Sequence, residues 1–397
     1  MKTREPISAE IWVLIAAAMI IALGFGFVAP ILPQFAASFD VGVMAASAIV
    51  SVFAFVRLIF APAGGALVNK FGERNIYVLG LSINAISTAL CGLAPDYWTL
   101  IVFRGFGGLG SVMFTVSSMA LLVKLSPPSQ RGHTASLYGT AFLLGSIAGP
   151  ILGSALSGLG LRAPFFIYSG AVFIAIAIVL IFLRGAAGGR PTSTDTRERM
   201  SLAEAMGLPY YRALLITAFA HGWANFGVRI ALLPLMAASV PAIGAAWAGI
   251  ALTLFAAGSA IAQQVTGRLV DRYGRRPFLV LGLAVSALAT AFFGWGENLF
   301  WFLGLSALAG VGAALLGPAS QALLGDLIGT ERNGGQALST YSMALDLGSI
   351  AGTMLAGLIA DVLGFGWAFA ATGLVLAAAA LPWLFVRRPP RTRLRPA

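Results

Sequence analysis

The chain has 397 residues, of which 59% are hydrophobic and only 10% are charged, and its formal net charge is +11. A soluble domain carries about 25% charged residues, because its surface must face water. The composition therefore excludes a soluble globular protein and predicts a chain surrounded by lipid, with no nucleic-acid partner. The single cysteine, Cys91, excludes an internal disulfide.

Long apolar stretches follow one another along the whole chain. A helix needs about 20 mainly apolar residues to cross roughly 30 Å of hydrocarbon. The first stretch is too long to be the apolar region of a cleaved signal peptide. We predict twelve membrane-spanning helices, near residues 11–36, 42–68, 76–94, 97–123, 134–157, 164–183, 212–239, 245–267, 278–295, 299–325, 336–360 and 367–386.

The polar stretch 184–211 divides these helices into two groups of six. Its Gly, Ser, Thr and Pro content is typical of a flexible linker. We therefore predict an all-α membrane protein with three parts. These are an N-terminal six-helix bundle (1–183), a cytoplasmic linker (184–211) and a C-terminal six-helix bundle with a basic tail (212–397).

Outside the predicted helices, the basic residues fall almost entirely on one side of the membrane. Arg162 lies on the face opposite the termini, and Arg57, Arg104 and Arg229 lie within helices, which leaves 21 of the 25 Lys and Arg residues on the face of the termini. Cytoplasmic loops of membrane proteins carry such an excess. We expect a multi-pass protein of the cell membrane with both termini in the cytoplasm.

The two halves repeat one another at an offset of about 202 residues. The loop Gly65-x3-Asn69-Lys70-Phe71-Gly72 corresponds to Gly267-x3-Asp271-Arg272-Tyr273-Gly274. In the same order, Gly108-Leu109-Gly110 corresponds to Gly310-Val311-Gly312, and Gly145 and Gly149 correspond to Gly348 and Gly352. Parallel repeats of this kind suit a transporter whose halves rock around a site between them.

These motifs resemble those of the major facilitator superfamily, and in particular its twelve-helix drug:proton antiporters. The loop Gly267–Arg276 is similar to the superfamily's loop signature, and Leu23-Gly24-x5-Pro30-x2-Pro33, Arg104-x3-Gly108 and Gly145-x3-Gly149-Pro150-x2-Gly153 resemble motifs of the first, fourth and fifth helices. The resemblance implies two pseudo-symmetric six-helix bundles that work by alternating access. It implies gating roles for Gly65, Asn69, Gly72, Gly145, Gly149, Pro150, Gly153, Gly267, Asp271, Arg272 and Gly274, and we expect the fifth-helix glycines to act between the fifth and eighth helices.

Two positions depart from the superfamily pattern. Asn69 and Lys124 stand where it tends to carry acids, while the second half keeps Asp271 and Asp326. In relatives the first-half acids help to close the cytoplasmic side. The departure suggests that this contact is weakened or rewired here.

Asp346 is the only carboxylate well inside a predicted helix, about ten residues or roughly 15 Å from its start. Such a residue costs roughly 2.5–3.5 kcal/mol on insertion scales, so it requires a reason. A carboxylate removed from water binds a proton closer to neutral pH, as a proton carrier must. The competing interpretation is a permanent ion pair that holds helices together.

Arg57 lies at a similar depth in the second helix, which the resemblance places beside the eleventh. We expect a salt bridge between Arg57 and Asp346 that breaks on protonation, with Arg229 as the rival partner of Asp346. His221, Asn225 and Arg229 are spaced i, i+4 and i+8, which predicts a polar stripe facing a cavity or another helix. His221 is either a coupling residue or a hydrogen-bonding link between helices.

The resemblance implies a coupling role for Arg104, and hydrogen bonds to backbone carbonyls that join the first and fourth helices are the alternative. The aromatic candidates for the cavity wall, each of which could instead pack or face lipid, are Phe25, Phe53, Phe142, Phe226 and Tyr341. Little fixed charge and many aromatic residues favour an apolar or amphipathic substrate.

The leading hypothesis is a secondary active exporter that exchanges lipophilic or cationic small molecules for protons. A lipid or glycolipid exporter, an uptake carrier for a small metabolite and a non-transporting sensor are the alternatives. The chain has only two histidines, no nucleotide-binding loop and no Ser-His-Asp set at matched depths, so we do not expect an enzyme. We expect no metal and no cofactor other than the coupling protons, and a monomer in the bilayer.

Overall fold

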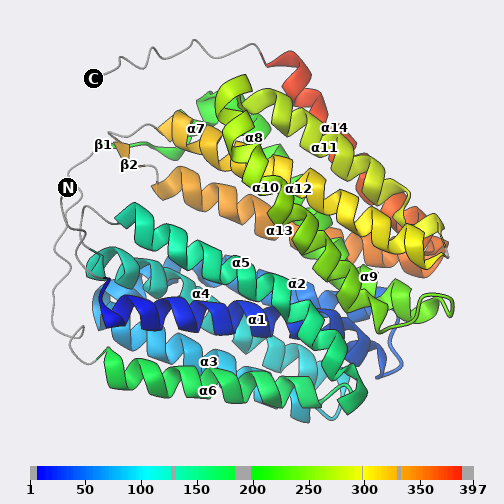
Figure 1. The fold of residues 1–397 in the computed structure, drawn as a ribbon, viewed down its shortest axis with the longest axis horizontal. Helices are drawn as coiled ribbons and strands as arrows, with labels where there is room; N and C mark the ends of the chain where they lie inside the picture. Colours follow the sequence, from blue (N-terminus) through cyan, green and yellow to red (C-terminus); the bar gives the residue numbers. More distant parts are fainter. Residues whose placement is uncertain are drawn as a thin grey trace.

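The computed structural model describes residues 7–126, 131–183, 198–296, 298–328, 332–333 and 335–386. In Figure 1, α1 to α6 form the lower group of helices and α8 to α14 form the upper group. The first group comprises α1 (Ala9–Ala37), α2 (Val43–Phe71), α3 (Glu73–Leu93), α4 (Tyr97–Leu125), α5 (Arg131–Leu156) and α6 (Ala163–Phe182). The second comprises α8 (Pro209–His221), η4 (Gly222–Val228), α9 (Arg229–Ser239), α10 (Trp247–Tyr273), α11 (Arg275–Ala291), α12 (Leu299–Ile328), α13 (Gly335–Leu363) and α14 (Phe365–Phe385).

The prediction of twelve membrane-spanning helices is confirmed. Ten helices of the described chain are long and apolar enough to cross a membrane, and α5 contains a shorter apolar segment, Leu137–Gly153. The twelfth crossing is the continuous run α8–η4–α9, over 209–239. Each group of helices encloses buried apolar side chains of its own, including Tyr77 and Phe165 in the first and Trp383 and Phe302 in the second.

The seventh crossing contains a π-helical segment, η4, that the sequence did not predict. Its glycines face the backbone of α13: a Cβ on Gly227 would lie 2.7 Å from the carbonyl oxygen of Ser349, and one on Gly222 would meet that of Leu345. Only glycine permits this approach. The π-helical geometry therefore accompanies the close packing of this crossing against α13, and π segments occur frequently at functional sites.

Two similar turns define one end of the bundle, which we call the basic end. Gly72 joins α2 to α3 and Gly274 joins α10 to α11, with φ angles of 83° and 92° that favour glycine. Arg74 and Arg276, which follow these turns, donate to the carbonyl oxygens of Leu180 and Leu384 at 3.2 and 3.3 Å. The other end, with the α1–α2 and α3–α4 turns, is called the opposite end.

The repeat also extends to an ion pair at the basic end, but with its charges exchanged. Lys124 Nζ lies 3.1 Å from Glu73 Oε2 in the first half, and Arg275 Nε lies 3.0 Å from Asp326 Oδ2 in the second. Glu73 and Arg275 are 202 positions apart in the chain, as are Lys124 and Asp326. Lys124 therefore takes part in the first-half counterpart of this ion pair, with the two charges exchanged.

We expect Lys124→Asp, which restores an acid at this position, to place two carboxylates together and to destabilise the first half. The double variant Glu73→Arg/Lys124→Asp would reproduce the second-half pair and recover the melting temperature. Because both side chains are partly exposed, the change is expected to be about 1 kcal/mol. Thermal unfolding of the detergent-solubilised variants measures it, and a single variant as stable as the double variant would contradict this account.

The glycines of the fifth crossing pack against α1, not against α10. A Cβ on Gly145 would lie 2.6 Å from the Met19 carbonyl oxygen, and one on Gly149 would lie 2.5 Å from that of Leu23. Gly153 and Pro150 also face α1, through Phe27 and Gly26. The motif therefore lies on the α1 side of the helix, and a gating role between the fifth and eighth crossings stays a prediction.

The prediction of a flexible linker over 184–211 is corrected for part of this stretch. Residues 184–197 lie outside the described part of the chain, but 198–207 form the two-residue strand β1 (Glu198–Arg199) and the short helix α7 (Leu202–Gly207). β1 pairs in parallel with β2 (Arg332–Asn333). The oxygen of Ser201 accepts from the Glu204 amide at 3.2 Å, a capping arrangement that Ser-x-x-Glu favours.

Candidate functional site

The interface between α2 and α13 joins the two halves and brings Arg57 and Asp346 together. Arg57 Nε lies 3.9 Å from Asp346 Oδ2, and the two side chains are 34% and 24% exposed. This distance is too long for a hydrogen bond. The charges attract one another across the boundary between the halves, but no directional hydrogen bond fixes them.

Arg57 is also held from its own half. Its Nη1 donates to Ser111 Oγ of α4 at 3.3 Å, whereas its buried Nε has no hydrogen-bond partner. Ser111 keeps the guanidinium directed toward the interface while Asp346 remains a loose partner. The sequence did not single out Ser111, because one serine among many on an apolar helix carries no signal of its own.

The same interface continues toward the opposite end through contacts that sequence reasoning also missed. Ser51 Oγ contacts Thr353 Oγ1 and donates to the Ile350 carbonyl at 3.4 Å. At the end of the interface, the Asp361 carboxylate accepts from the Val43 and Met44 amides at 2.7 and 2.8 Å. The residues Asp346, Ile350, Thr353, Gly357 and Asp361 follow a helical spacing, which was the available signal.

The polar stripe of the seventh crossing is present as predicted. Asn225 Nδ2 lies 3.2 Å from His221 Nδ1, and Arg229 Nε donates to Asn225 Oδ1 at 3.4 Å. Gly222, next to His221, packs on the backbone of Leu345, so the start of the stripe lies near the depth of Asp346. No ion pair joins Arg229 to Asp346 in the described structure, which leaves Arg57 as the observed partner.

Arg229 and Arg104 occupy comparable settings in the two halves. The guanidinium carbon of Arg104 lies 4.1 Å from the ring centre of Phe53, and that of Arg229 lies 4.3 Å from that of Phe255. Phe53 and Phe255 are 202 positions apart and therefore correspond in the repeat. Both arginines are buried, and neither forms a salt bridge with a described carboxylate.

These contacts bear on the alternative interpretation of Arg104. Its observed aromatic partner joins α4 to α2, not α4 to α1, and its buried Nε has no hydrogen-bond partner. A cation over an aromatic face is stabilised by roughly 0.5–2 kcal/mol, more when water is excluded. The ring of Phe53 thus holds the Arg104 guanidinium in place, while no described carboxylate balances its positive charge.

The aromatic candidates differ in whether their side chains are exposed or buried. Phe25 packs on Phe53 with ring centres 6.4 Å apart, Phe226 packs edge-on against His221, and both Phe25 and Phe226 remain exposed. Phe142 is also exposed. Tyr341 is buried in the packing of the second half, so its expected place in a cavity wall was wrong.

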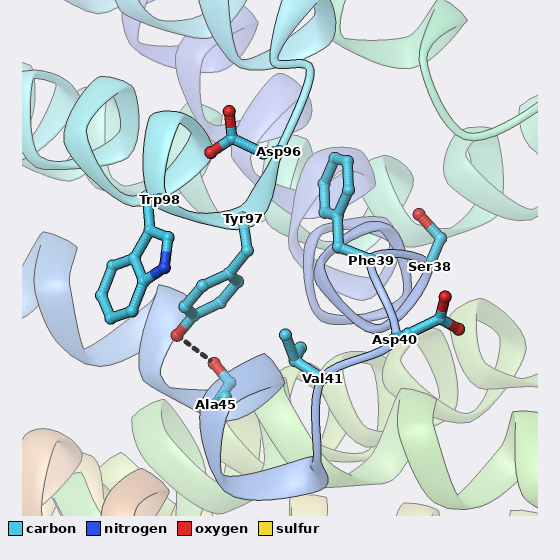
Figure 2. A pocket seen from close by; sticks show the side chains of 8 residues that line it. All are labelled: Ser38, Phe39, Asp40, Val41, Ala45, Asp96, Tyr97 and Trp98. Carbon is cyan, nitrogen blue, oxygen red and sulfur yellow. Dashed lines mark hydrogen bonds between the residues drawn. The ribbon is translucent and has the colours of Figure 1, made fainter.

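Two pockets of the described structure bear on the search for a site. One, of about 470 Å³, lies between α5 and α10 and is lined by Gly139, Thr140, Phe142, Leu143, Ser146 and Gln263. The larger, of about 660 Å³, lies at the opposite end within the first half and is lined by Ser38, Phe39, Asp40, Val41, Ala45, Asp96, Tyr97 and Trp98 (Figure 2). Phe142 is the one predicted site residue that lines either pocket.

The larger pocket is formed by the α1–α2 and α3–α4 turns and the first residues of α2 and α4, and no predicted site residue lines it. Tyr97 donates to the Ala45 carbonyl at 2.8 Å, which ties α4 to α2 at its edge (Figure 2). Asp96 caps its own helix: its Oδ1 accepts from the Thr99 amide at 2.8 Å and its Oδ2 from the Thr99 hydroxyl at 2.9 Å. These hydrogen bonds lower the pKa of Asp96, which therefore stays ionised near neutral pH.

The loop motifs add few described side-chain contacts. The surroundings of Gly65 and the side chains of Asn69 and Asp271 fall outside the described part of the structure. Arg272 packs over the ring of Tyr273 at the basic end. Within the described residues, no group of three or more His, Cys, Asp or Glu side chains is placed to hold a metal ion.

Comparisons with known proteins agree with this architecture. The family model described as Major Facilitator Superfamily matches residues 14–249 and 214–397. The tetracycline resistance protein, class G, of Vibrio anguillarum is 29% identical over 351 residues, which are 84% of this chain and 86% of that protein. The multidrug efflux protein YfmO of Bacillus subtilis is 29% identical over 222 residues, 56% of this chain and about half (54%) of that protein.

Solved structures give the same fold at low sequence identity. A bacterial homologue of the human lysosomal transporter Spinster, in an inward-facing and unoccupied conformation, superimposes with a TM-score of 0.81 at 17% identity, covering 96% of this chain and 97% of that one. The nucleoside transporter NupG superimposes with a TM-score of 0.76 at 12% identity, covering 94% and 99% of the two chains.

Proposed function

The chain belongs to the Major Facilitator Superfamily, and on this premise we propose that it exports lipophilic small molecules in exchange for protons, by alternating access. The observation that carries the proposal is the loose pair of Arg57 and Asp346, which lies near the middle of α2 and α13, between the two halves. The names of the efflux relatives support the direction of transport. The orientation follows the basic residues, so the basic end faces the cytoplasm.

The proposed cycle uses Asp346 in two protonation states. Ionised Asp346 attracts Arg57 across the interface and can also attract a cationic group of a substrate. Protonated Asp346 loses both attractions, which releases the substrate and removes one of the contacts that hold α2 to α13. Competition between proton and substrate for one carboxylate makes the exchange obligatory. The chain contains both halves of the interface, so we propose a monomeric transporter with no cofactor beyond the coupling protons.

An anionic lipid exporter is the second candidate, and the buried arginines favour it. Arg104 and Arg229 lie over phenylalanine rings without a described acidic partner, and Arg57 has only a distant one. Together with Asp346, these side chains leave an excess of positive charge within the membrane-spanning region. A substrate with a phosphate or carboxylate group would neutralise that excess.

One assay separates the two candidates. Purified protein is reconstituted in vesicles that carry either a lipophilic cationic dye or a fluorescent anionic phospholipid, and a pH gradient is imposed. We expect gradient-driven efflux of the dye, and no protein-dependent transfer of the phospholipid between leaflets. Phospholipid transfer without dye efflux would overturn the drug-export proposal in favour of the lipid exporter.

A further inference from the structure

Asp361 forms a contact between the halves that the proposed transport cycle does not yet use. Its two carboxylate oxygens accept from consecutive backbone amides of α2, Val43 at 2.7 Å and Met44 at 2.8 Å. Asp361 belongs to α13 in the second half, and these amides form the first turn of α2 in the first half. The contact therefore closes the α2–α13 interface at the opposite end of the molecule.

The first turn of α2 depends on this contact for its cap. The N-cap residue of α2 is Gly42, which has no side chain to accept from the exposed amides. By contrast, α4 is capped within its own half by Asp96. A carboxylate at a helix N-terminus is stabilised both by the hydrogen bonds and by the helix dipole. In α2 that stabilisation exists only while the two halves stay together.

Glycines allow the carboxylate to come this close. A Cβ on Gly42 would lie 3.1 Å from Asp361 Oδ2, and one on Gly357, a turn earlier on α13, would lie 2.9 Å from the Met44 Cα. Larger residues at either position would push the helix ends apart. The small size of Gly42 and Gly357 is therefore what permits the contact between Asp361 and the first turn of α2.

The contact has no counterpart in the other interface between the halves. Gly145 and Gly149 of α5 correspond to Gly348 and Gly352 of α13 at an offset of 203, and at this offset Gly158 corresponds to Asp361. Glycine offers no carboxylate to cap a neighbouring helix. An acidic cap at the opposite end therefore belongs to the α2–α13 interface and not to its repeat counterpart.

We propose that Asp361 is a gating residue, whose capping of α2 from the other half holds the opposite end of the transporter closed. The state open at that end must separate α2 from α13 and so must break these two hydrogen bonds. This inference extends the proposed function but needs neither its substrate nor its coupling ion. Asp361 thereby sets the balance between the closed and open states.

The test measures that balance directly, in the absence of substrate and of any pH gradient. In full-length protein with Cys91 replaced by Ala, spin labels are attached to Trp98→Cys and Phe300→Cys. These two positions are 202 residues apart and lie at the opposite-end starts of α4 and α12, where their side chains are 75% and 84% exposed. A second pair at Lys70 and Arg272 reports on the basic end. Pulsed electron–electron double resonance gives the distribution of distances between the two spin labels of each pair.

Two variants weaken the contact by different routes. Asp361→Asn removes the charge, and Gly42→Ser gives α2 a cap of its own while crowding Asp361. In each we expect the open-to-closed population ratio at the opposite end to rise about 2- to 10-fold, the effect of losing a helix cap. The Lys70–Arg272 distance should shorten in the same samples.

The matched control is Asp40→Asn, which removes a carboxylate just before α2 that forms no hydrogen bond or ion pair with α13 in the described structure. Asp40 has a φ of 57°, a conformation that Asn also tolerates, so the backbone should be preserved. Its distance distributions should equal those of the parent protein. Unchanged distributions in both Asp361→Asn and Gly42→Ser, or an equal shift in Asp40→Asn, would overturn the proposal. Failure of dye efflux would leave this result standing and reject only the proposed function.

Discussion

Asp346→Asn is expected to reduce gradient-driven efflux to the level of protein-free vesicles while the protein remains folded. Asparagine has nearly the same shape as aspartate but can neither release a proton nor attract Arg57 or a cationic substrate. The assay compares both proteins, at equal reconstituted amounts, under an imposed pH gradient. Size-exclusion chromatography and thermal unfolding confirm that the variant is intact, and efflux at the parental rate would contradict a coupling role for Asp346.

Exchanging the charges tests the pairing itself. The double variant Arg57→Asp/Asp346→Arg keeps opposite charges on α2 and α13, so it should recover part of the expression and stability lost in each single variant. The exchange Arg229→Asp/Asp346→Arg serves as the matched control, because no ion pair joins those two residues. Equal recovery in both exchanges would show that the effect depends on net charge and not on the α2–α13 pair.

Gly149→Val is expected to have the second largest effect, through packing between α1 and α5. A Cβ at this position would lie 2.5 Å from the Leu23 carbonyl oxygen and 2.7 Å from the Gly26 Cα, and backbone atoms cannot move aside as a side chain can. Overpacking of this kind costs roughly 1–3 kcal/mol or more. We expect the melting temperature to fall by roughly 5 to 10 °C, with a matching loss of efflux.

Gly170→Val in α6 is the control for this prediction. Apart from its chain neighbours and the nearby backbone of its own helix, no atom lies within 4 Å of a Cβ built on Gly170, so the same substitution should leave the melting temperature close to that of the parent protein. Gly352→Val should behave like Gly149→Val, since its Cβ would lie 2.7 Å from the Trp223 carbonyl oxygen in the second half. Equal melting temperatures for Gly149→Val and Gly170→Val would contradict the packing account.

The helices were predictable because hydrocarbon imposes a length and a composition on every crossing. The π segment over 222–228 was not, since it accompanies the backbone of α13 packing against Gly222 and Gly227, far away in the sequence. The same limit applies to Gly145 and Gly149, whose packing against α1 the sequence did not indicate. Small residues show that two helices approach closely, but they do not show which helix is the partner.

The site was predictable where depth and charge carried the information. Asp346 and Arg57 stand out because ionisable residues are rare at that depth, and their meeting follows once the second and eleventh crossings are placed together. Ser111 and Thr353 carry no such signal, because their hydroxyls act only through the neighbours that the fold supplies. The exchanged pair of Glu73 and Lys124 was visible in the repeat, where both residues align with residues of opposite charge.

Proton-coupled export through Asp346 is tested most directly by reversing the pH gradient. Vesicles containing the protein and a lipophilic cationic dye are clamped at zero membrane potential, and the gradient is imposed first in one direction and then in the other. The account predicts that the dye moves against the proton flow in both cases, and that Asp346→Asn abolishes both movements. Protein-dependent dye movement at the same rate and in the same direction under both gradients would contradict it.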